Sequence, residues 1–179
     1  ISVGYEFGCS SSEIQNGFNK LVVPGRSEIV NVNPDFTVMV DYAHSPDSLK
    51  NILLATREYV KGRIICVFGC GGDRDPIKRP IMGNIATKLS DYVIFTSDNP
   101  RTEDPNQIMN DIIAGVDSNN YEIEFDRIIA IQKALDMMNK NDIVLILGKG
   151  HENYQIIGRE KIHLDDYEEV EKYIKNKNG

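Results

Sequence analysis

Three charged, glycine-rich stretches each directly follow an apolar run, and they carry most of the side chains that could do chemistry. The stretches are residues 69–75, 98–101 and 148–152, and the apolar runs are residues 64–68, 92–96 and 143–147. If these runs are parallel strands, their carboxyl ends meet at one edge of a sheet, where ligands bind in open α/β folds. The sequence therefore predicts a charged binding site at that edge.

The stretch Asp98-Asn99-Pro100-Arg101 combines a carboxylate, an amide and a guanidinium. Asp98 could hold an ammonium group, whereas the planar fork of Arg101 matches a carboxylate or a phosphate. Pro100 stiffens the turn and disfavours helical geometry at Asn99. A ligand with both charges, such as an amino acid, would suit this stretch. An ordinary polar strand-to-helix turn would explain it equally well.

The stretch from Gly69 to Asp75 contains glycines that allow a ligand to approach the backbone closely. It leads into a helix whose amino end would favour an anion. Lys78 and Arg79 oppose the dipole of that helix, which is easier to understand if an anion binds there. The stretch matches neither G-x-G-x-x-G nor G-x-x-x-x-G-K-[ST], and a tight turn remains the alternative.

The stretch after residues 143–147 contains His151 and Glu152, which could form a general base and its partner. A polar anchoring role for His151 is favoured, because no nucleophile accompanies it.

After residues 36–42, Ser45 and Pro46 are typical of a helix start. That leaves Asp41, Tyr42 and His44, whose carboxylate could hold ribose hydroxyls and whose rings could lie against a base.

The elements that must position these loops alternate between strand and helix from residue 36 onward. Strands are predicted at 36–42, 63–68, 92–96, 121–125 and 143–147, and helices at 46–60, 77–89, 105–115, 126–139 and 165–176. This order predicts an α/β, Rossmann-like, doubly wound fold with a mostly parallel sheet and helices on both faces. A hairpin or a pair of neighbouring strands is predicted at 28–42, with a turn at residues 33–35, and a hairpin at 154–164. Residues 1–24 are predicted to be a short helix, capped at residues 10–12, and a linker.

The bulk composition is typical of a globular domain and narrows the function classes. The chain has 179 residues, 41% of them hydrophobic, and a formal net charge of −7, which argues against nucleic acid as a partner. Three cysteines without a pairing pattern fit a reducing cytoplasm, and their spacing favours no metal site. The absence of a long apolar run argues against a membrane partner. The chain begins with Ile1, which predicts a fragment of a longer protein.

Taken together, the spaced motifs resemble the C-terminal domain of the Mur ligases, in particular of the members that add meso-diaminopimelate. The resemblance covers nearly the whole chain, and the set of ordered motifs is far more specific than any one of them. The motifs are Pro24-Gly25-Arg26-Ser27-Glu28, Asp41-Tyr42-Ala43-His44-Ser45-Pro46-Asp47, Gly69-Cys70-Gly71-Gly72-Asp73-Arg74-Asp75, Lys78-Arg79-Pro80, Asp98-Asn99-Pro100-Arg101 and Gly148-Lys149-Gly150-His151-Glu152.

The resemblance implies an ATP- and Mg²⁺-dependent ligase that joins an amino acid to UDP-MurNAc-L-Ala-D-Glu through an acyl phosphate, in peptidoglycan synthesis. It implies a meso-diaminopimelate site at Arg74, Asp98, Asn99, Pro100, Arg101, Gly148 and Glu152. It implies a nucleotide site at Arg26, Asp41, Tyr42 and His44, with Asp73 and Lys78 as weaker candidates. No catalytic base is expected, because positioning and charge neutralisation would carry the reaction.

The same resemblance predicts how the chain divides. Residues 1–24 would be the end of a central ATPase domain, and residues 25–179 the amino-acid-binding domain. The UDP-sugar domain, the triphosphate loop and the Mg²⁺ ligands would lie outside this chain. The chain alone is therefore expected to be inactive as a ligase. The protein is expected to be a cytoplasmic monomer.

Two other functions remain open. The chain could be the C-terminal domain of another Mur-type or folylpolyglutamate-type ligase, although relatives that add glutamate or alanine would not need the motif at 98–101. It could instead be a stand-alone regulatory module that binds an amino acid. A dinucleotide dehydrogenase fits less well, because the glycine pattern is wrong.

Overall fold

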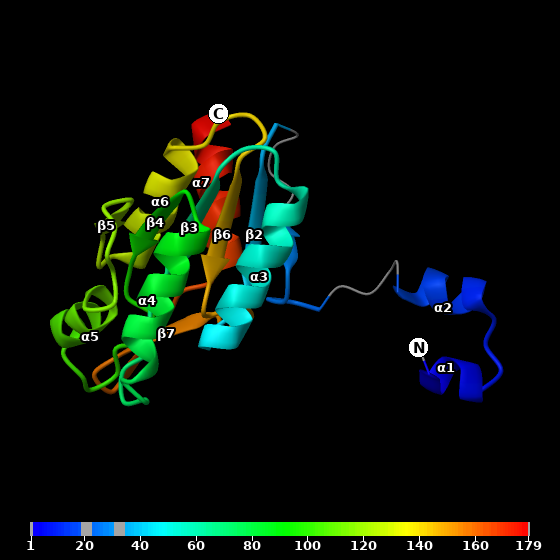
Figure 1. The fold of residues 1–179 in the computed structure, drawn as a ribbon, viewed down its shortest axis with the longest axis horizontal. Helices are drawn as coiled ribbons and strands as arrows, with labels where there is room; N and C mark the ends of the chain where they lie inside the picture. The colour runs from blue at the N-terminus through cyan, green and yellow to red at the C-terminus, as the bar shows by residue number, and fades with distance from the viewer. Residues whose placement is uncertain (1, 19–22, 31–34, 179) are drawn as a thin grey trace.

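A parallel-stranded sheet forms the centre of the molecule (Figure 1). The computed structural model describes residues 2–18, 23–30 and 35–178. Within these residues the main sheet has six strands in the order β1-β2-β6-β3-β4-β5. Their bounds are β1 (Glu28–Val30), β2 (Thr37–Asp41), β3 (Ile64–Phe68), β4 (Tyr92–Phe95), β5 (Tyr121–Ile123) and β6 (Ile143–Leu147).

Only β1 runs against its neighbour in this sheet. It pairs antiparallel with β2, which confirms the predicted pair of strands, although residues 31–34 between the two strands lie outside the described residues. The pairs β2–β6, β6–β3, β3–β4 and β4–β5 are all parallel. The predicted mostly parallel α/β sheet is therefore confirmed.

Helices cover both faces of the sheet, as a doubly wound fold requires (Figure 1). One hydrophobic core joins the sheet to α3 (Pro46–Tyr59), α4 (Lys78–Leu89) and α5 (Pro105–Ile113). A second core joins the opposite face to α6 (Arg127–Asp136) and α7 (Asp166–Asn178). Every residue of β3 and β6 is buried, which explains why these strands are continuous apolar runs rather than alternating ones.

Local capping fixes where the helices begin. Ser45 accepts a hydrogen bond from the backbone N–H of Ser48, and the Ser48 hydroxyl accepts one in return from the backbone of Ser45. Pro46 is the first residue of α3, where its missing N–H costs nothing. The carboxylates of Asp104 and Asp126 cap α5 and α6 by accepting from backbone N–H groups of the first turn. The starts of α3, α5 and α6 were therefore predicted to within a residue.

The connection order brings four loops to one edge. From β2 to β5 the chain moves across the sheet through α3, α4 and α5, and α6 then returns it on the other face. This return inserts β6 between β2 and β3, so that the loops after β2, β6, β3 and β4 are neighbours at the carboxyl ends of the strands. The predicted convergence of the three glycine-rich stretches follows directly from this topology.

A small second sheet lies against this edge. The predicted hairpin is confirmed as β7 (Tyr154–Ile157) and β8 (Glu160–His163), which pair antiparallel. An isolated parallel bridge between Arg101 and Ile157 attaches the hairpin to the loop after β4. The hairpin therefore belongs to the loop cluster rather than to the main sheet.

The amino-terminal segment forms two short helices, not the single helix expected. These are α1 (Ser2–Glu6) and α2 (Ser11–Phe18), drawn apart from the sheet in Figure 1. The predicted cap is present at Ser10, whose hydroxyl accepts from the N–H of Glu13 while the Glu13 carboxylate accepts from the N–H of Ser10. Gly8 adopts a positive φ of 78° between the two helices, which separates them.

Of the helices formed by the described residues, none combines the length and the apolar character that a membrane span needs.

Candidate functional site

A polar pocket of about 340 Å³ lies at the carboxyl ends of β2, β3, β4 and β6. Six of the seven residues predicted to bind an amino acid line it, together with two of the four predicted to bind a nucleotide. The lining residues are Tyr42, His44, Cys70, Gly71, Arg74, Lys78, Asp98, Asn99, Arg101, Gly148, Glu152 and Tyr154. The structure thus gathers residues from 42 to 154 into one pocket that presents both signs of charge.

Arg101 is fixed by its backbone and by its side chain. Its φ is 53°, a left-handed conformation that is uncommon for a residue other than glycine. The backbone N–H donates to Ile156 O at 3.0 Å, and Gly158 N donates to the Arg101 carbonyl at 2.6 Å. One guanidinium nitrogen donates to Gly72 O at 2.8 Å. The hairpin therefore holds Arg101 in a strained conformation at the pocket wall.

Asn99 connects the loop after β4 to the loop after β6. Its side-chain nitrogen donates to Glu152 Oε2 at 2.8 Å, and its side-chain oxygen accepts from the backbone N–H of Ile156 at 2.9 Å. The side chain is 2% exposed, so most of its hydrogen-bonding capacity is used inside the protein. Asn99 therefore orients Glu152 as well as lining the pocket.

Lys149 is a residue whose place in this site the sequence analysis missed. Its side chain is fully buried, and its ammonium lies 3.4 Å from Glu152 Oε2 and 3.5 Å from Asn99 Oδ1. It also donates to the carbonyl of Tyr154. Burial lowers the pKa of Lys149, although the charge of Asp98 opposes this change. The only signal in the sequence was its position between Gly148 and Gly150, which does not distinguish a buried lysine from an exposed one.

Asp98 lies at the base of the pocket, close to a buried ion pair. Its carboxylate accepts from the N–H of Asn99 at 2.6 Å, and its carbonyl accepts from the buried Gln155 side chain at 2.7 Å. Behind it Arg127 and Asp166, both fully buried, form two hydrogen bonds of 2.8 and 2.7 Å. Arg127 also donates to Ser97 O and Leu147 O, so this pair joins the ends of β4 and β6.

Aromatic rings and a cation meet on the other side of the pocket. The ring of Tyr42 lies 4.5 Å from that of His44 and 5.2 Å from that of His151. The guanidinium of Arg26 lies 4.7 Å from the centre of the Tyr42 ring. Flat rings beside exposed cationic groups are the surface that a nucleotide base and its phosphates require.

Asp41 is placed differently from its predicted neighbours. It is 9% exposed, and its carboxylate accepts from the backbone N–H of Ser27 at 2.7 Å. Asp41 therefore fixes the segment that carries Arg26. The same segment lies against the loop after β6, because a Cβ on Gly25 would lie 2.0 Å from His151 N. Glycine is needed at this close approach, which the sequence alone did not reveal.

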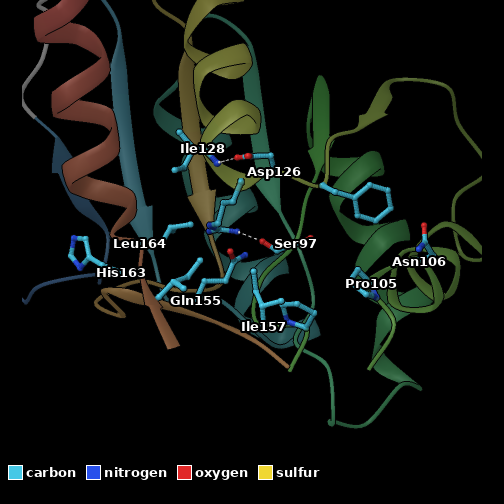
Figure 2. Close-up of a pocket in the computed structure, with 13 residues that line it drawn as sticks. Ser97, Pro105, Asn106, Asp126, Ile128, Gln155, Ile157, His163 and Leu164 are labelled. Atoms are coloured by element: carbon cyan, nitrogen blue, oxygen red, sulfur yellow. Dashed lines mark hydrogen bonds between the residues drawn. The ribbon is translucent and has the colours of Figure 1, made fainter. Parts of the chain in front are cut away.

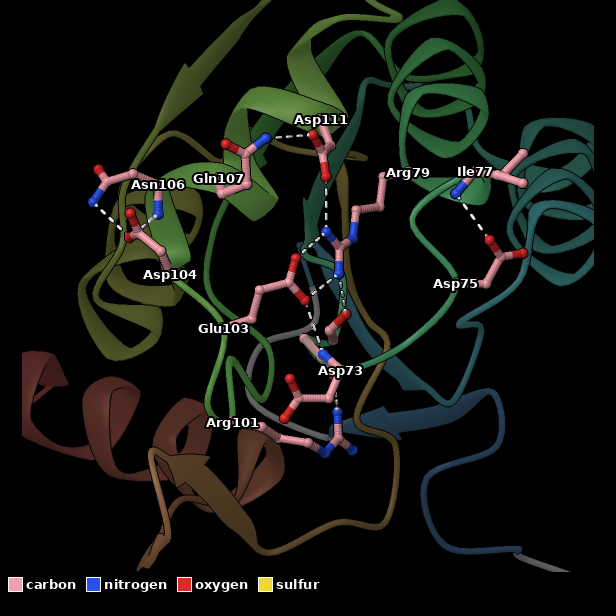
Figure 3. Close-up of polar contacts among 12 residues, drawn as sticks. Asp73, Asp75, Ile77, Arg79, Arg101, Glu103, Asp104, Asn106, Gln107 and Asp111 are labelled. Atoms are coloured by element: carbon pink, nitrogen blue, oxygen red, sulfur yellow. Dashed lines mark hydrogen bonds and ion pairs between the residues drawn. The ribbon is translucent and has the colours of Figure 1, made fainter.

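Arg79 does not offer its charge to a visiting anion, which corrects the interpretation of the first turn of α4. Its buried guanidinium donates to Glu103 at 2.6 and 2.7 Å and to Asp111 at 2.8 Å (Figure 3). Hydrogen bonding to Glu103 raises the pKa of Arg79 above its ordinary value. Arg79 therefore joins α4 to α5 and to the loop after β4. Lys78, by contrast, lines the pocket and donates to His44 O at 3.0 Å.

Asp73 and Pro100, two further candidates, do not line the polar pocket. The Asp73 carboxylate accepts from the backbone and the hydroxyl of Thr102, at 3.0 to 3.1 Å. Pro100 lines a different pocket of about 470 Å³, which lies between the hairpin and the starts of α5 and α6 (Figure 2). That second pocket is mostly apolar, with Phe125, Ile157 and Ile162 among its walls.

Among the residues that the structure describes, no group of three or more His, Cys, Asp or Glu side chains is gathered in a way that could hold a metal ion.

The fold and the pocket agree with the match to a protein family. The model of the family described as "Mur ligase, glutamate ligase domain" matches residues 25–150, which is more than half of the chain. The chain belongs to the Mur ligase family. The match contains the loops after β2, β3, β4 and β6 up to Gly150, and thus most of the polar pocket.

Several curated Mur ligases that are similar to this chain are named as 2,6-diaminopimelate ligases. The UDP-N-acetylmuramoyl-L-alanyl-D-glutamate--2,6-diaminopimelate ligase 1 of Clostridium acetobutylicum is 54% identical over 171 residues, which is 94% of this chain and 36% of that protein. The ligase of Synechocystis is 56% identical over 154 residues, 83% of this chain and 30% of that protein. The chain thus spans about a third of the length of the relatives it matches.

Solved structures agree with the fold. A structure of a UDP-N-acetylmuramoyl-L-alanyl-D-glutamate--2,6-diaminopimelate ligase superposes with a TM-score of 0.83 at 38% identity, over 99% of this chain and 37% of that chain. Escherichia coli FolC in complex with ADP superposes with a TM-score of 0.64 at 20% identity, over 95% of this chain and 36% of that chain. At that identity the second likeness shows a shared fold alone.

Proposed function

We propose that this chain is the amino-acid-binding domain of a Mur ligase that adds meso-diaminopimelate to UDP-MurNAc-L-Ala-D-Glu. The observation that carries the proposal is the polar pocket, in which Arg74 and Arg101 lie with Asp98 and Glu152. Diaminopimelate has two carboxylates and two ammonium groups, so each charge of the pocket has a counterpart on the ligand. The printed names of relatives at 54% and 56% identity support the same substrate.

Arg101 is the proposed reader of the second carboxylate. Lysine carries the same two amino groups as diaminopimelate but has only one carboxylate. With lysine bound, Arg101 would face a cavity without a matching charge. A charge-assisted hydrogen bond contributes roughly 1.5–3 kcal/mol, which corresponds to about one to two decades of selectivity.

The nucleotide would lie beside the ring cluster, on Tyr42 and His44 with the exposed Arg26. Lys78 would extend this side toward the phosphates, since it lines the same pocket. Asp41 would act on the nucleotide through the segment it fixes, because its carboxylate already accepts from Ser27. In the proposed reaction the peptide carboxylate takes the γ-phosphoryl group of ATP and ADP is released. The amine then attacks the acyl phosphate, which forms the amide bond and releases phosphate.

The remaining parts of the machinery belong to the proposal as well. The triphosphate loop, the Mg²⁺ ligands and the UDP-sugar site would lie outside this chain, and residues 1–24 would end the preceding ATPase domain. The full-length enzyme would be a cytoplasmic monomer. Catalysis by this chain's residues would consist of positioning and charge neutralisation. This chain alone would accordingly show no ATP-dependent ligation.

The proposal is tested by NMR titration of the isotope-labelled chain with meso-diaminopimelate and, separately, with L-lysine. We expect diaminopimelate to shift the backbone amides of residues 74, 98–101 and 148–152, and L-lysine to leave them in place at the same concentration. Comparable shifts with both amino acids would contradict the assignment of selectivity to this domain. If neither shifts them, turnover of the full-length enzyme with each amino acid separates a wrong substrate from a pocket that other domains complete.

A further inference from the structure

The proposed function leaves the fully buried Lys149 without a role. A buried ammonium is costly unless it is paired, and the same loop could have carried an apolar side chain at this position. Lys149 lies beneath the pocket lining, where its ammonium contacts groups from the loops after β4 and β6 and from β7. It therefore connects the loops after β4 and β6, which carry most of the proposed amino-acid site, with the hairpin.

The contacts of Lys149 converge on two pocket residues. Its ammonium lies 3.4 Å from Glu152 Oε2, the same oxygen that accepts from Asn99 Nδ2 at 2.8 Å. Two donors thus fix one oxygen of this carboxylate. The other oxygen, Oε1, is the one available to a cation in the pocket, and Glu152 is 15% exposed there.

Lys149 also determines which way the Asn99 amide faces. An amide has one accepting and one donating end, and Asn99 Oδ1 faces both the Lys149 ammonium and the backbone N–H of Ile156. With the oxygen on that side, the Nδ2 group must face Glu152. Without the ammonium, one of the two donors that hold this orientation is lost.

The charges around the pocket base explain why a cation is required there. Asp98, Glu152 and Asp166 are the carboxylates whose charges act on Lys149, and Arg127 is the cation beside it. Arg127 already forms two hydrogen bonds with Asp166. Lys149 therefore contributes, together with Arg127, to compensating the charges of Asp98 and Glu152 from beneath the pocket.

We propose that Lys149 is a positioning residue for the amino-acid site, in which its buried ammonium presets the Glu152 carboxylate and the Asn99 amide to receive a ligand ammonium group. This inference rests on the proposed function, because it takes meso-diaminopimelate as the ligand. Lys149 acts through Glu152 and Asn99 and does not touch the ligand. Its removal loosens the receiving carboxylate, takes a donor from the Tyr154 carbonyl and leaves the Asn99 amide oxygen with one donor instead of two.

The test is a double-mutant cycle in the full-length ligase, with Lys149→Met, Glu152→Gln and the two combined. We expect Lys149→Met to raise the KM for meso-diaminopimelate at least tenfold and to change the KM for ATP less than twofold. In the Glu152→Gln background the same change should raise the KM for the amino acid less than threefold, because the carboxylate it positions is gone. The matched control is Lys161→Met, which removes an exposed ammonium 3.6 Å from the Tyr154 ring centre and should leave both constants within twofold.

Three results would overturn the positioning role. One is an equal rise of the KM for the amino acid in both backgrounds, and another is an unchanged KM in Lys149→Met. The third is a parallel rise of the KM for ATP together with a lower melting temperature, which would mean a structural role only. A wild-type enzyme that turns over no meso-diaminopimelate would overturn the proposed function and this inference together.

A second measurement on the wild-type chain covers the case in which Lys149→Met does not fold. Because the Lys149 ammonium is buried and hydrogen-bonded, we expect its ¹⁵N-correlated proton signal to be observable and to shift when meso-diaminopimelate is added. An ammonium signal that stays in place while the backbone amide of Glu152 shifts would overturn the positioning role.

Discussion

Two buried cations at the same edge of the sheet have very different surroundings. Arg79 makes three hydrogen bonds of 2.6 to 2.8 Å with the carboxylates of Glu103 and Asp111 (Figure 3). Lys149 is equally buried, but its contacts with Glu152 and Asn99 are 3.4 and 3.5 Å long. Both terminal nitrogens of the guanidinium donate to carboxylates or a carbonyl inside the protein, and among the described residues only its buried Nε lacks a partner. The carboxylate beside the ammonium instead keeps capacity for another cation.

Within one loop cluster, some charged residues stabilise the structure and others are available to bind a ligand. The Arg79 cluster, formed by Arg79, Glu103 and Asp111, closes α4 onto α5, and its one cation is paired with two carboxylates inside the protein. The polar pocket instead presents Arg74, Arg101, Asp98 and Glu152 to a space of about 340 Å³. A charged residue in a glycine-rich or strand-end motif is therefore not by itself a ligand contact, and what decides its role is whether it is already paired inside the protein.

The largest effect on stability is expected from Arg79→Ala, which removes the cation of the Arg79 cluster. The change leaves Glu103 and Asp111 facing each other without their cation, and both are about a quarter exposed. We expect the free energy of unfolding to fall by about 3 kcal/mol, the lower end for a broken buried pair. Chemical denaturation measures it. The control Arg57→Ala removes an ion pair that is 42% and 41% exposed and should cost less than about 1 kcal/mol. Equal losses of stability in the two variants would contradict the structural role assigned to Arg79.

A smaller effect, on recognition, is expected from Arg101→Lys in the full-length enzyme. Lysine keeps a positive charge but lacks the planar fork that matches a carboxylate. We expect the ratio of kcat/KM for meso-diaminopimelate to that for L-lysine to fall by about 10- to 100-fold, corresponding to roughly 1.5–3 kcal/mol. Steady-state kinetics with both amino acids measures it. An unchanged ratio would show that selectivity arises outside this pocket.

The smallest expected effect is the acid sensitivity of the Arg79 cluster. Hydrogen bonding to Arg79 lowers the pKa of Glu103 below its ordinary value of 4.5. Because the folded-state pKa is the lower one, this carboxylate contributes its full stability above the ordinary value and loses it as the pH falls through the folded-state value. Denaturant melts between pH 7 and pH 3 should show wild type losing more stability than Glu103→Gln. Identical pH profiles would contradict the pairing seen here.

Much of the fold was present in local patterns of the sequence. The continuous apolar runs of β3 and β6 predicted buried parallel strands, and Ser45 with Pro46 predicted the start of α3. Those signals are local, because side-chain periodicity and capping depend on neighbours a few residues away. They were sufficient to predict how strands and helices alternate along the chain and at which edge of the sheet the loops meet. The division of the first turns into α1 and α2 was missed, since Gly8 interrupts a weak pattern.

The sequence determined which residue types could form the pocket. The tertiary structure determined which of them line it and which pair within the protein. The motifs placed Asp98, Arg101 and Glu152 at strand ends, and chain topology alone then brought them together. Only the tertiary structure decided that Arg79 pairs within the protein while Lys78, its neighbour, lines the pocket. It also decided that Lys149 is buried beneath Asn99, 50 residues away. The physical reason is that a charge finds its partner by distance in space, which local sequence does not record.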